Sequence, residues 1–340
     1  MLDRGTVPGG QHAAGGDPVS RHRVAGTAVS AGFLAVCPVR PRRAAGPRPG
    51  TVRTVLRLGR RSFADDDLLV MAIVNRTKDS FYDRGATFEE DVALERVRAV
   101  VFEGADVVDI GGVKAGPGEV VKAAEEIRRT VPLVGRVRAE FPDLVISVDT
   151  WRSEVAREVC RAGADLLNDA WGGFDPRLAE VAAEYGAALV CTHTNGAAPR
   201  TPPHRPSYDD VVVAAIDATV ALAERAVSLG VDAESVLIDP AHDFDKNTWH
   251  SLELTRRLDE MVATGWPVLV SLSHKDFVGE TLDRGVDDRL LGTLAATAVS
   301  AWQGARVYRV HDAAETREVL DMVASIRGTR PPTRPVRGLA

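Results

Sequence analysis

The segment 68–85, LLVMAIVNRTKDSFYDRG, decides our interpretation of the fold. It begins with an apolar run over 68–74, which directly follows three aspartates. A run this short is typical of a β-strand that is buried on both faces. The chain becomes polar at once from Asn75 onward. A buried strand that ends in a polar loop is how an α/β barrel begins the face that carries its chemistry.

The same alternation of a short apolar run and a helical pattern occurs seven more times. The further predicted strands lie at 106–110, 144–150, 166–169, 187–193, 236–240, 267–273 and 305–311. The predicted helices lie at 91–102, 119–140 with a break at Pro132, 153–163, 176–185, 208–229, 251–263, 288–302 and 313–326. Eight such pairs predict a (β/α)8 TIM barrel. A doubly wound open sheet is the alternative, but no G-x-G-x-x-G motif follows the first strand.

The first sixty-one residues differ in composition from the rest of the chain. They contain eleven Arg, no Lys and two Asp, a charge of about +9, so the remainder of a chain with net charge −6 carries about −15. They are rich in Gly, Pro and Ala and show no helical or strand period, so we expect a disordered extension over 1–61. We assign the barrel to 62–328 and a flexible tail to 329–340, where prolines cluster.

Composition also bears on the class of partner and the location. The acidic body argues against nucleic acid, and no apolar stretch is long enough for a membrane span. The weakly apolar run at 24–36 is too poor in Leu for a good signal peptide. Three cysteines (Cys37, Cys160 and Cys191) lack a paired spacing, which is typical of a reducing compartment. We therefore expect a cytoplasmic protein.

Polar side chains stand at the ends of the predicted strands, where a barrel carries its chemistry. They are Asn75, Asp109, Asp149, Asn168, His193, Asp239, Ser273 with Lys275, and Arg309 with His311. Each alone has a structural explanation, such as capping the next helix or, for Arg309, pairing with a rim acid. Together they would fill one cavity with acids, amides and cations. The desolvation cost of such a cavity favours a functional role.

These residue types fit a flat nitrogen heterocycle. A carboxylate such as Asp239 accepts two parallel N–H bonds from a guanidine-like edge. Lys275 can donate to a ring carbonyl, and Asn168 can both donate and accept. A second group, Asn75, Arg309 and His311, is suited to phosphate oxygens and a hard cation. We call this second group the phosphate corner.

Seven motifs in order resemble those of the dihydropteroate synthase family. They are MAIVNRTKDSF, DIGGVKAGPG, ISVDT, LLND, IDPAHDFDKN, SLSHKDF and RVHD, and the resemblance spans 68–327. It implies a transferase of folate biosynthesis that condenses dihydropterin pyrophosphate with para-aminobenzoate, with Mg2+ as cofactor and pyrophosphate as leaving group.

The resemblance also implies roles for individual residues. The pterin would be held by Asp149, Asn168, Asp239 and Lys275, and the phosphates by Arg309 and His311, with Asn75 helping to place Mg2+. The residues expected to be catalytic are Lys275, Asp149 and Arg309. The expected partners are these small molecules, or another amine in place of para-aminobenzoate, and a second copy of the chain in a homodimer.

The chain departs from the family pattern mainly on the side of the second substrate. Val113–Gly116 replace the Glu-Ser-Thr-Arg of D-I-G-G-E-S-T-R-P-G, and Arg76 and Lys78 replace Thr and Pro in the first loop. His274 replaces the Arg of Ser-Arg-Lys, so we expect a cation that titrates near neutrality and helps to hold an anionic nucleophile. The segment 239–246 replaces three glycines of D-P-G-x-G-F-G-K.

Three hypotheses follow from these departures. Arg76, Lys78 and Lys114 restore the lost cationic charge, and transferase activity survives. Alternatively, the barrel performs methyl transfer on a pterin, although that chemistry needs no phosphate corner. In the third hypothesis, the protein is a non-catalytic or altered-substrate paralogue that binds a pterin or phosphate.

Overall fold

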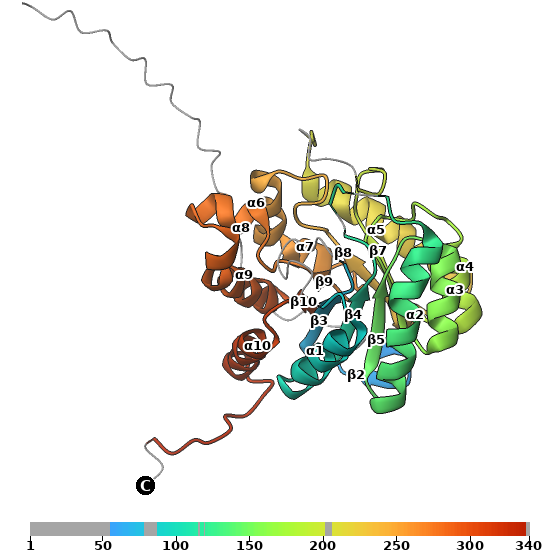
Figure 1. The fold of residues 1–340 in the computed structure, drawn as a ribbon. Coiled ribbons are helices and arrows are strands. Elements are labelled where there is room, and N and C mark those ends of the chain that lie inside the picture. Colours follow the sequence, from blue (N-terminus) through green and yellow to red (C-terminus); the bar gives the residue numbers. More distant parts are fainter. Residues whose placement is uncertain (1–54, 78–86, 115, 119, 201–205, 338–340) are drawn as a thin grey trace, which may run out of the picture. The chain divides into compact units, whose positions relative to one another are not determined.

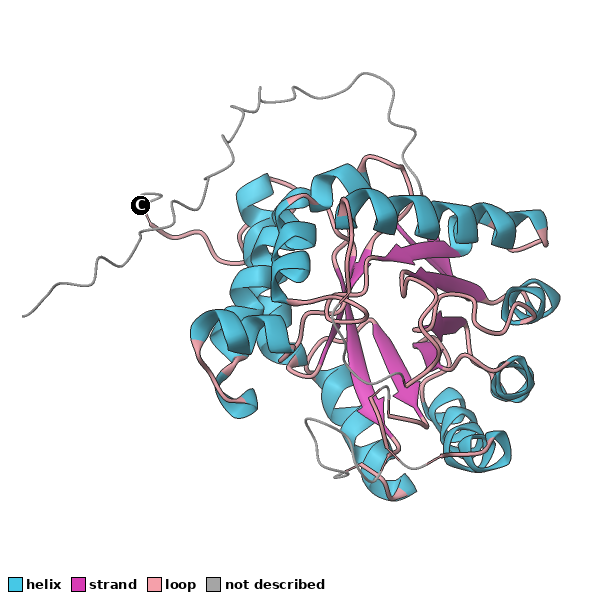
Figure 2. Ribbon diagram, turned by 90° about the horizontal axis from the view of Figure 1, so that it is seen from above, coloured by secondary structure: helices cyan, strands magenta, loops and turns pink. Residues whose placement is uncertain are grey.

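The computed structural model describes residues 55–77, 87–114, 116–118, 120–200 and 206–337. The main sheet has eight parallel strands. It curves into a barrel that is surrounded by helices (Figures 1 and 2). The strands are β3 (Leu69–Asn75), β4 (Val107–Gly111), β5 (Val145–Asp149), β6 (Leu166–Asp169), β7 (Ala188–Thr192), β8 (Val236–Asp239), β9 (Leu269–Val270) and β10 (Val307–Val310). Their order is β8-β7-β6-β5-β4-β3-β10-β9, and a parallel bridge between Ile238 and Val268 joins the two ends. The predicted (β/α)8 barrel is confirmed.

The helices follow the predicted positions with three differences. They are α1 (Glu90–Phe102), α2 (Ala123–Glu140), α3 (Ser153–Ala162), α4 (Leu178–Tyr185), α5 (Val211–Ser228), α6 (Thr248–Arg256), α7 (Leu258–Val262), α8 (Asp276–Leu282), α9 (Leu290–Gln303) and α10 (Ala313–Arg327). Pro132 does not break α2, whose buried residues Leu133, Val134 and Val137 continue beyond it. The predicted helix at 251–263 is divided into α6 and α7, and α8 was not predicted.

The alternation of side chains along the strands determines what lies inside the barrel. In the lower half, every second residue is apolar and belongs to one buried cluster: Leu69, Met71, Val107, Val145, Leu166, Ala188, Val190, Leu237, Leu269 and Val307. The intervening residues, such as Val70 and Ala72 of β3, belong to a second cluster that includes the buried faces of the helices. The lower interior is therefore a packed core, and ligands are confined to the upper end.

An antiparallel hairpin packs against the lower interior. It consists of β1 (Leu56–Leu58) and β2 (Arg61–Phe63). Leu56, Leu58 and Phe63 are buried in the same cluster as the interior of the barrel. The predicted boundary at residue 62 is therefore wrong, because β1 belongs to the folded domain. The remainder of the predicted extension, 1–54, lies outside the described residues.

Two further predictions concern the C-terminal tail and membrane-spanning segments. Residues 329–337 contain no helix or strand. Within the part of the chain that the structure describes, no helix has the length and apolarity to cross a membrane.

Substitutions in β1 test the role of the hairpin. We expect Leu58→Ala to lower the free energy of unfolding by about 2–5 kcal/mol, because it opens a cavity in the core. The neighbouring Arg57 is half-exposed and pairs only at the surface with Asp232 and Glu234, so Arg57→Ala should cost less than about 1 kcal/mol. Urea denaturation followed by circular dichroism measures both. Equal effects would contradict a packed hairpin.

Candidate functional site

Polar residues replace apolar ones in the upper half of the barrel interior. Two residues beyond the apolar layer, the same inward faces carry Asp109, Ser147, Asn168 and Arg309. Strand register then places Asn75 beside Gly111, Gly111 beside Asp149, and Asp149 beside Asn168. The predicted rim is therefore a continuous row, because parallel strands end at one edge of the barrel.

Asp109 is the centre of a buried hydrogen-bond network. Its carboxylate accepts bonds from the Ser147 hydroxyl (2.6 Å), the Asn168 amide (3.2 Å) and the Arg309 Nε (2.6 Å). Its side chain is fully buried, whereas that of Arg309 is 18% exposed. A buried carboxylate of this kind is tolerated because a paired cation and neutral donors surround it.

Arg309 also binds a second acid. Its Nη2 lies 2.9 Å from Oδ2 of Asp149. Burial raises the pKa of Asp149 to about 7 and outweighs the opposing effect of the Arg309 charge. The structure thus brings Asp149, Asn168 and Arg309 together, but two donor atoms of Arg309 are already bound to carboxylates.

The loops after β8 and β9 each add a lysine to the mouth of the barrel, beside the acid at the end of β8. Asp239 accepts the backbone N–H of Ala241 (2.7 Å), and burial raises its pKa. Lys275 donates to the carbonyl of His242, and its ammonium lies 4.8 Å from the centre of the Phe244 ring. Lys246 donates to the carbonyls of His193 (3.1 Å) and Phe244 (2.8 Å).

Lys246 is a site residue that the sequence analysis did not single out. It is 8% exposed, and burial lowers its pKa to about 7 although the charge of Asp239 acts in the other direction. The sequence did contain a signal for this residue, because Lys246 is the last residue of the segment 239–246, which was compared with the family pattern D-P-G-x-G-F-G-K.

The two rim histidines contribute little positive charge. Nδ1 of His311 lies 3.0 Å from the Ser273 hydroxyl, and burial together with the Arg309 charge lowers the pKa of His311 to about 3. Burial and the charge of Lys246 likewise lower the pKa of His193 to about 3. Both imidazoles are therefore neutral near pH 7.

Two residues that were expected to supply positive charge at the mouth are held elsewhere. Arg76 donates to the carbonyl of Phe88 (2.8 Å) and lies 3.6 Å from Glu90, at the start of α1. His274 is 1% exposed, and its two ring nitrogens lie 3.0 Å from the carbonyl of Val286 and 2.6 Å from Asp312. The expectation that His274 helps to hold a nucleophile is not supported by these contacts. Lys78 lies outside the described residues.

An aromatic cluster fixes the loop after β4. Val113 is buried against Trp151 and Trp171, whose ring centres are 6.4 Å apart, and Phe244 packs edge-on against Trp171 at 5.5 Å. Arg200 donates to the carbonyl of Gly116 (3.0 Å) and Arg129 to that of Gly112 (3.0 Å). Val113, which stands where the family pattern has glutamate, thus serves packing.

The described residues do not form a complete site for a resident Mg2+. Asn75 offers a single neutral side-chain oxygen, which faces Gly111. No group of three His, Cys, Asp or Glu side chains suited to a metal occurs among the described residues. Mg2+ bound through one or two protein oxygens depends on phosphate oxygens from a ligand.

Comparison with known proteins agrees with the motifs. The profile of the family described as pterin binding enzyme matches residues 71–311. A Mycobacterium leprae protein named inactive dihydropteroate synthase 2 is 61% identical over 82% of this chain and 98% of its own length. Haemophilus influenzae dihydropteroate synthase is 36% identical over 74% of this chain and 91% of its own. The Yersinia pestis dihydropteroate synthase with a sulfonamide drug superposes with a TM-score of 0.76, at 34% identity, over 81% of this chain and all of that one.

The pKa of Asp149 predicts how stability depends on pH. The folded chain retains the Asp149 proton up to about pH 7, whereas the unfolded chain releases it near its ordinary value of 3.8. Between these values the folded state binds more protons, so this residue makes stability fall as pH rises, by at most about 1.4 kcal/mol per pH unit. In Asp149→Asn this contribution should be absent. Thermal unfolding between about pH 4 and about 7 measures the difference, with the exposed Asp143→Asn as control. A parent and an Asp149→Asn variant with parallel profiles would contradict the shifted pKa.

Proposed function

The chain belongs to the pterin binding enzyme family, and from this premise we propose that its barrel binds a pterin-like heterocycle without condensing it with para-aminobenzoate. In this proposal Asp239 accepts the guanidine-like edge of the ring, and Asn168 and Lys275 bind its other polar atoms. The transferase reaction that the motifs suggest becomes the alternative, to be decided by experiment.

The observation that carries the proposal is the pairing of Arg309 with Asp109 and Asp149. In a condensation that releases pyrophosphate, cations must stabilise the negative charge that grows on the leaving group. Here Arg309 is bound to two acids, and His311 is neutral because its pKa is about 3. Binding of a phosphate by Arg309 would leave buried carboxylates without their cation, at a substantial cost.

The second-substrate side supports the same proposal. The family pattern has Glu-Ser-Thr-Arg where this chain has Val113–Gly116. Val113 packs against two tryptophans, and Gly116 has no side chain to reach a carboxylate or a phosphate. The groups that would position para-aminobenzoate are thus replaced by packing contacts. The name of the Mycobacterium leprae relative, which is 61% identical, points in the same direction.

We propose that Asn75 binds Mg2+ only together with a phosphorylated ligand, so pterin binding itself requires no metal. We also propose a cytoplasmic location, in keeping with the free thiols of Cys160 and Cys191.

Isothermal titration calorimetry tests the proposed function. A reduced pterin without phosphate should bind with the same affinity in the presence of EDTA or Mg2+. The pyrophosphate ester with Mg2+ should bind no more tightly than the unphosphorylated pterin, because Arg309 is already paired with two acids. Chromatography after addition of para-aminobenzoate should detect no dihydropteroate. Formation of that product would establish the transferase alternative, and a lack of binding by any pterin would refute the proposal.

Asp239→Asn tests the assignment of the pterin edge. An amide cannot accept two parallel N–H bonds, so pterin affinity should fall by about 2–5 kcal/mol. The control is Asp175→Asn, because Asp175 lies outside the mouth and accepts the backbone N–H of Ser153 (3.0 Å). Calorimetry measures the pterin affinity of both variants. An unchanged affinity in Asp239→Asn would show that the guanidine-like edge of the pterin binds elsewhere.

We further propose that two copies of the chain associate through α9 and α10. α9 contains no charged residue, and its exposed side includes Leu291, Val299 and Trp302. Met322 and Ile326 are exposed on α10, which α9 contacts through a bond from Arg327 to the carbonyl of Ala301 (3.1 Å). An apolar area of this kind is typical of an interface between subunits.

Trp302→Glu tests this interface. A charge placed in an apolar interface is buried without a partner, so the dimer should dissociate. Trp249, which is 78% exposed on α6, provides the matched control in Trp249→Glu. Analytical ultracentrifugation should find a dimer for the parent and the control, and a monomer for Trp302→Glu. A parent that is monomeric at high concentration would rule out the homodimer.

A further inference from the structure

The loop after β8 has a backbone that is unusual for its sequence. Ala241, Asp243 and Asp245 adopt φ angles of +54°, +66° and +51°. These are the three positions at which the family pattern given above has glycine. A side chain in this left-handed region costs free energy, although Asp tolerates it better than most residues. Contacts of these side chains must compensate for this cost.

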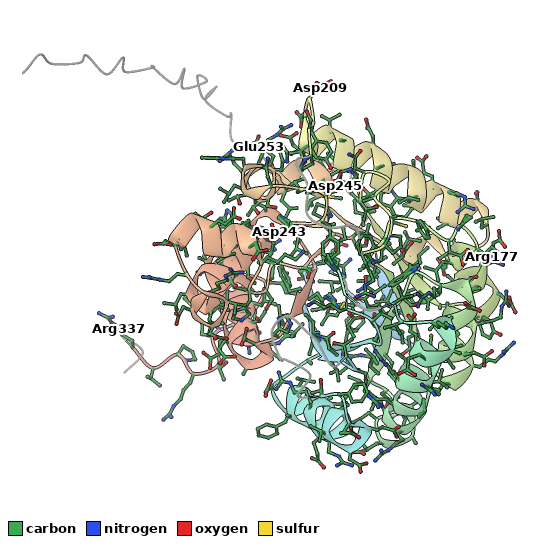
Figure 3. The ribbon with its side chains drawn as sticks, turned by 45° about the horizontal axis from the view of Figure 1, so that its top comes forward. Arg177, Asp209, Asp243, Asp245, Glu253 and Arg337 are labelled. Carbon is green, nitrogen blue, oxygen red and sulfur yellow. The ribbon has the colours of Figure 1, made fainter. Side chains whose placement is uncertain are left out.

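Asp243 makes contacts that glycine could not make. One carboxylate oxygen accepts the Ser251 hydroxyl on α6 (2.9 Å), and the other accepts the backbone N–H of Phe277 at the start of α8 (3.2 Å). Its own N–H donates to the same hydroxyl (3.1 Å). Figure 3 shows Asp243 at the upper end of the barrel, between the segments that carry these partners. Asp243 therefore joins the loop to two helices.

The same carboxylate acts on Lys275. Five charged groups face the Lys275 ammonium: Asp239 from β8, Asp243 and Lys246 from the following loop, Asp276 from α8 and Arg309 from β10. Among them Asp243 has the largest effect in favour of the charged form, followed by Asp239. Burial acts in the opposite direction and lowers the Lys275 pKa. The lysine expected to donate to the ligand thus depends on an acid that the family pattern lacks.

Asp243 also changes the charge of the mouth. The carboxylate of Asp243 adds one negative charge to the mouth, which glycine at this position would not supply. An added negative charge disfavours an anionic ligand and favours a neutral heterocycle with N–H donors.

From this arrangement we propose that Asp243 is a positioning and specificity-determining residue. It accepts the N–H of Phe277, two residues after Lys275, while the Lys275 ammonium donates to the carbonyl of His242, the residue before Asp243. Asp243 thereby orients Lys275, places a negative charge near it, and makes the mouth select an unphosphorylated N–H-rich heterocycle over its pyrophosphate ester. The selectivity part rests on the function proposed above, whereas the effect on Lys275 does not depend on any ligand.

The chain provides a matched control in the same loop. Asp245 has a similar φ of +51°, and its side chain accepts the Tyr208 hydroxyl (3.0 Å). Asp245 faces Lys246, whereas the charge of Asp243 has the largest effect in favour of the charged form of Lys275. Asp243→Asn and Asp245→Asn thus remove one charge each from neighbouring left-handed positions, and Asn tolerates this conformation.

The first experiment measures the titration of Lys275 in the ligand-free protein. Lysine side chains are labelled with 13C, the Lys275 signal is assigned with Lys275→Arg, and NMR spectra are recorded across the alkaline pH range. In Asp243→Asn the Lys275 midpoint should move down by roughly one pH unit, because an opposing charge has been removed. In Asp245→Asn the midpoint should move less, because Asp243 has the largest effect among the charges that favour the ammonium form. An unchanged midpoint in Asp243→Asn, or an equal shift in both variants, overturns the proposal.

The second experiment measures selectivity by calorimetry with a reduced pterin and its pyrophosphate ester. In Asp243→Asn the ratio of the two affinities should shift towards the ester by up to about tenfold, the equivalent of one pKa unit. Pterin affinity should also decline at a lower pH than in the parent. Should Asp243→Asn fail to fold, Asp243→Gly restores the residue of the family pattern and removes the same charge.

The outcomes of the two experiments separate the two proposals. If the parent binds no pterin while the Lys275 midpoint shifts as expected, the proposed function fails and the positioning role of Asp243 stands. If pterin binds but the ratio of affinities is the same in Asp243→Asn and the parent, the role in specificity is refuted.

Discussion

The upper interior of this barrel depends on one cation, the guanidinium of Arg309. It extends from β10 and binds carboxylates on β4 and β5, and Asp109 in turn accepts hydrogen bonds from β5 and β6. A single network therefore connects four strands. Breaking a buried ion pair of this kind typically costs about 3–5 kcal/mol, because a charge is left without its partner. The acids can remain inside the barrel only while Arg309 remains with them.

This constraint links structure to function. A residue cannot compensate two buried acids and bind a leaving phosphate at the same time without a change in the protonation or position of those acids. The raised pKa of Asp149 shows how close that carboxylate is to being protonated near pH 7. The network therefore favours a ligand that leaves Arg309 in place, which is the basis of the proposed pterin binding without condensation.

Much of this architecture could be predicted from the sequence, because its signals are local. Eight short apolar runs predicted eight strands, and the polar residue after each run predicted the rim. The missed elements had weaker or competing signals. In Leu56–Leu58 the apolar alternation is only three residues long and lies in an Arg-rich context, so composition suggested disorder. Pro132 was expected to break the helix over 119–140, but burial of the residues beyond it maintains α2.

The site could be predicted less completely than the fold, because contacts between distant segments are not visible in a sequence. The residue types at the rim were predicted, but not which acid Arg309 binds, and Arg76 and His274 were expected to face the mouth. Likewise, the sequence showed that three glycines after Asp239 are replaced, but it did not show how this changes the contacts of the loop. Only the backbone shows that the glycine-type conformation is retained while Asp243 bridges α6 and α8.

The two altered regions act on different parts of the reaction. Val113, packed between tryptophans, affects the side on which a second substrate would be captured. Asp243 and the acids around Arg309 affect the charge that a leaving pyrophosphate would meet. Condensation requires both a stabilised leaving group and a positioned nucleophile, since each lowers the same barrier. Reverting one region alone would therefore leave the other obstacle in place, whereas binding of an uncharged heterocycle requires neither. In the proposed function, this asymmetry is what lets the barrel keep a ligand site although the groups needed for turnover differ from the family pattern.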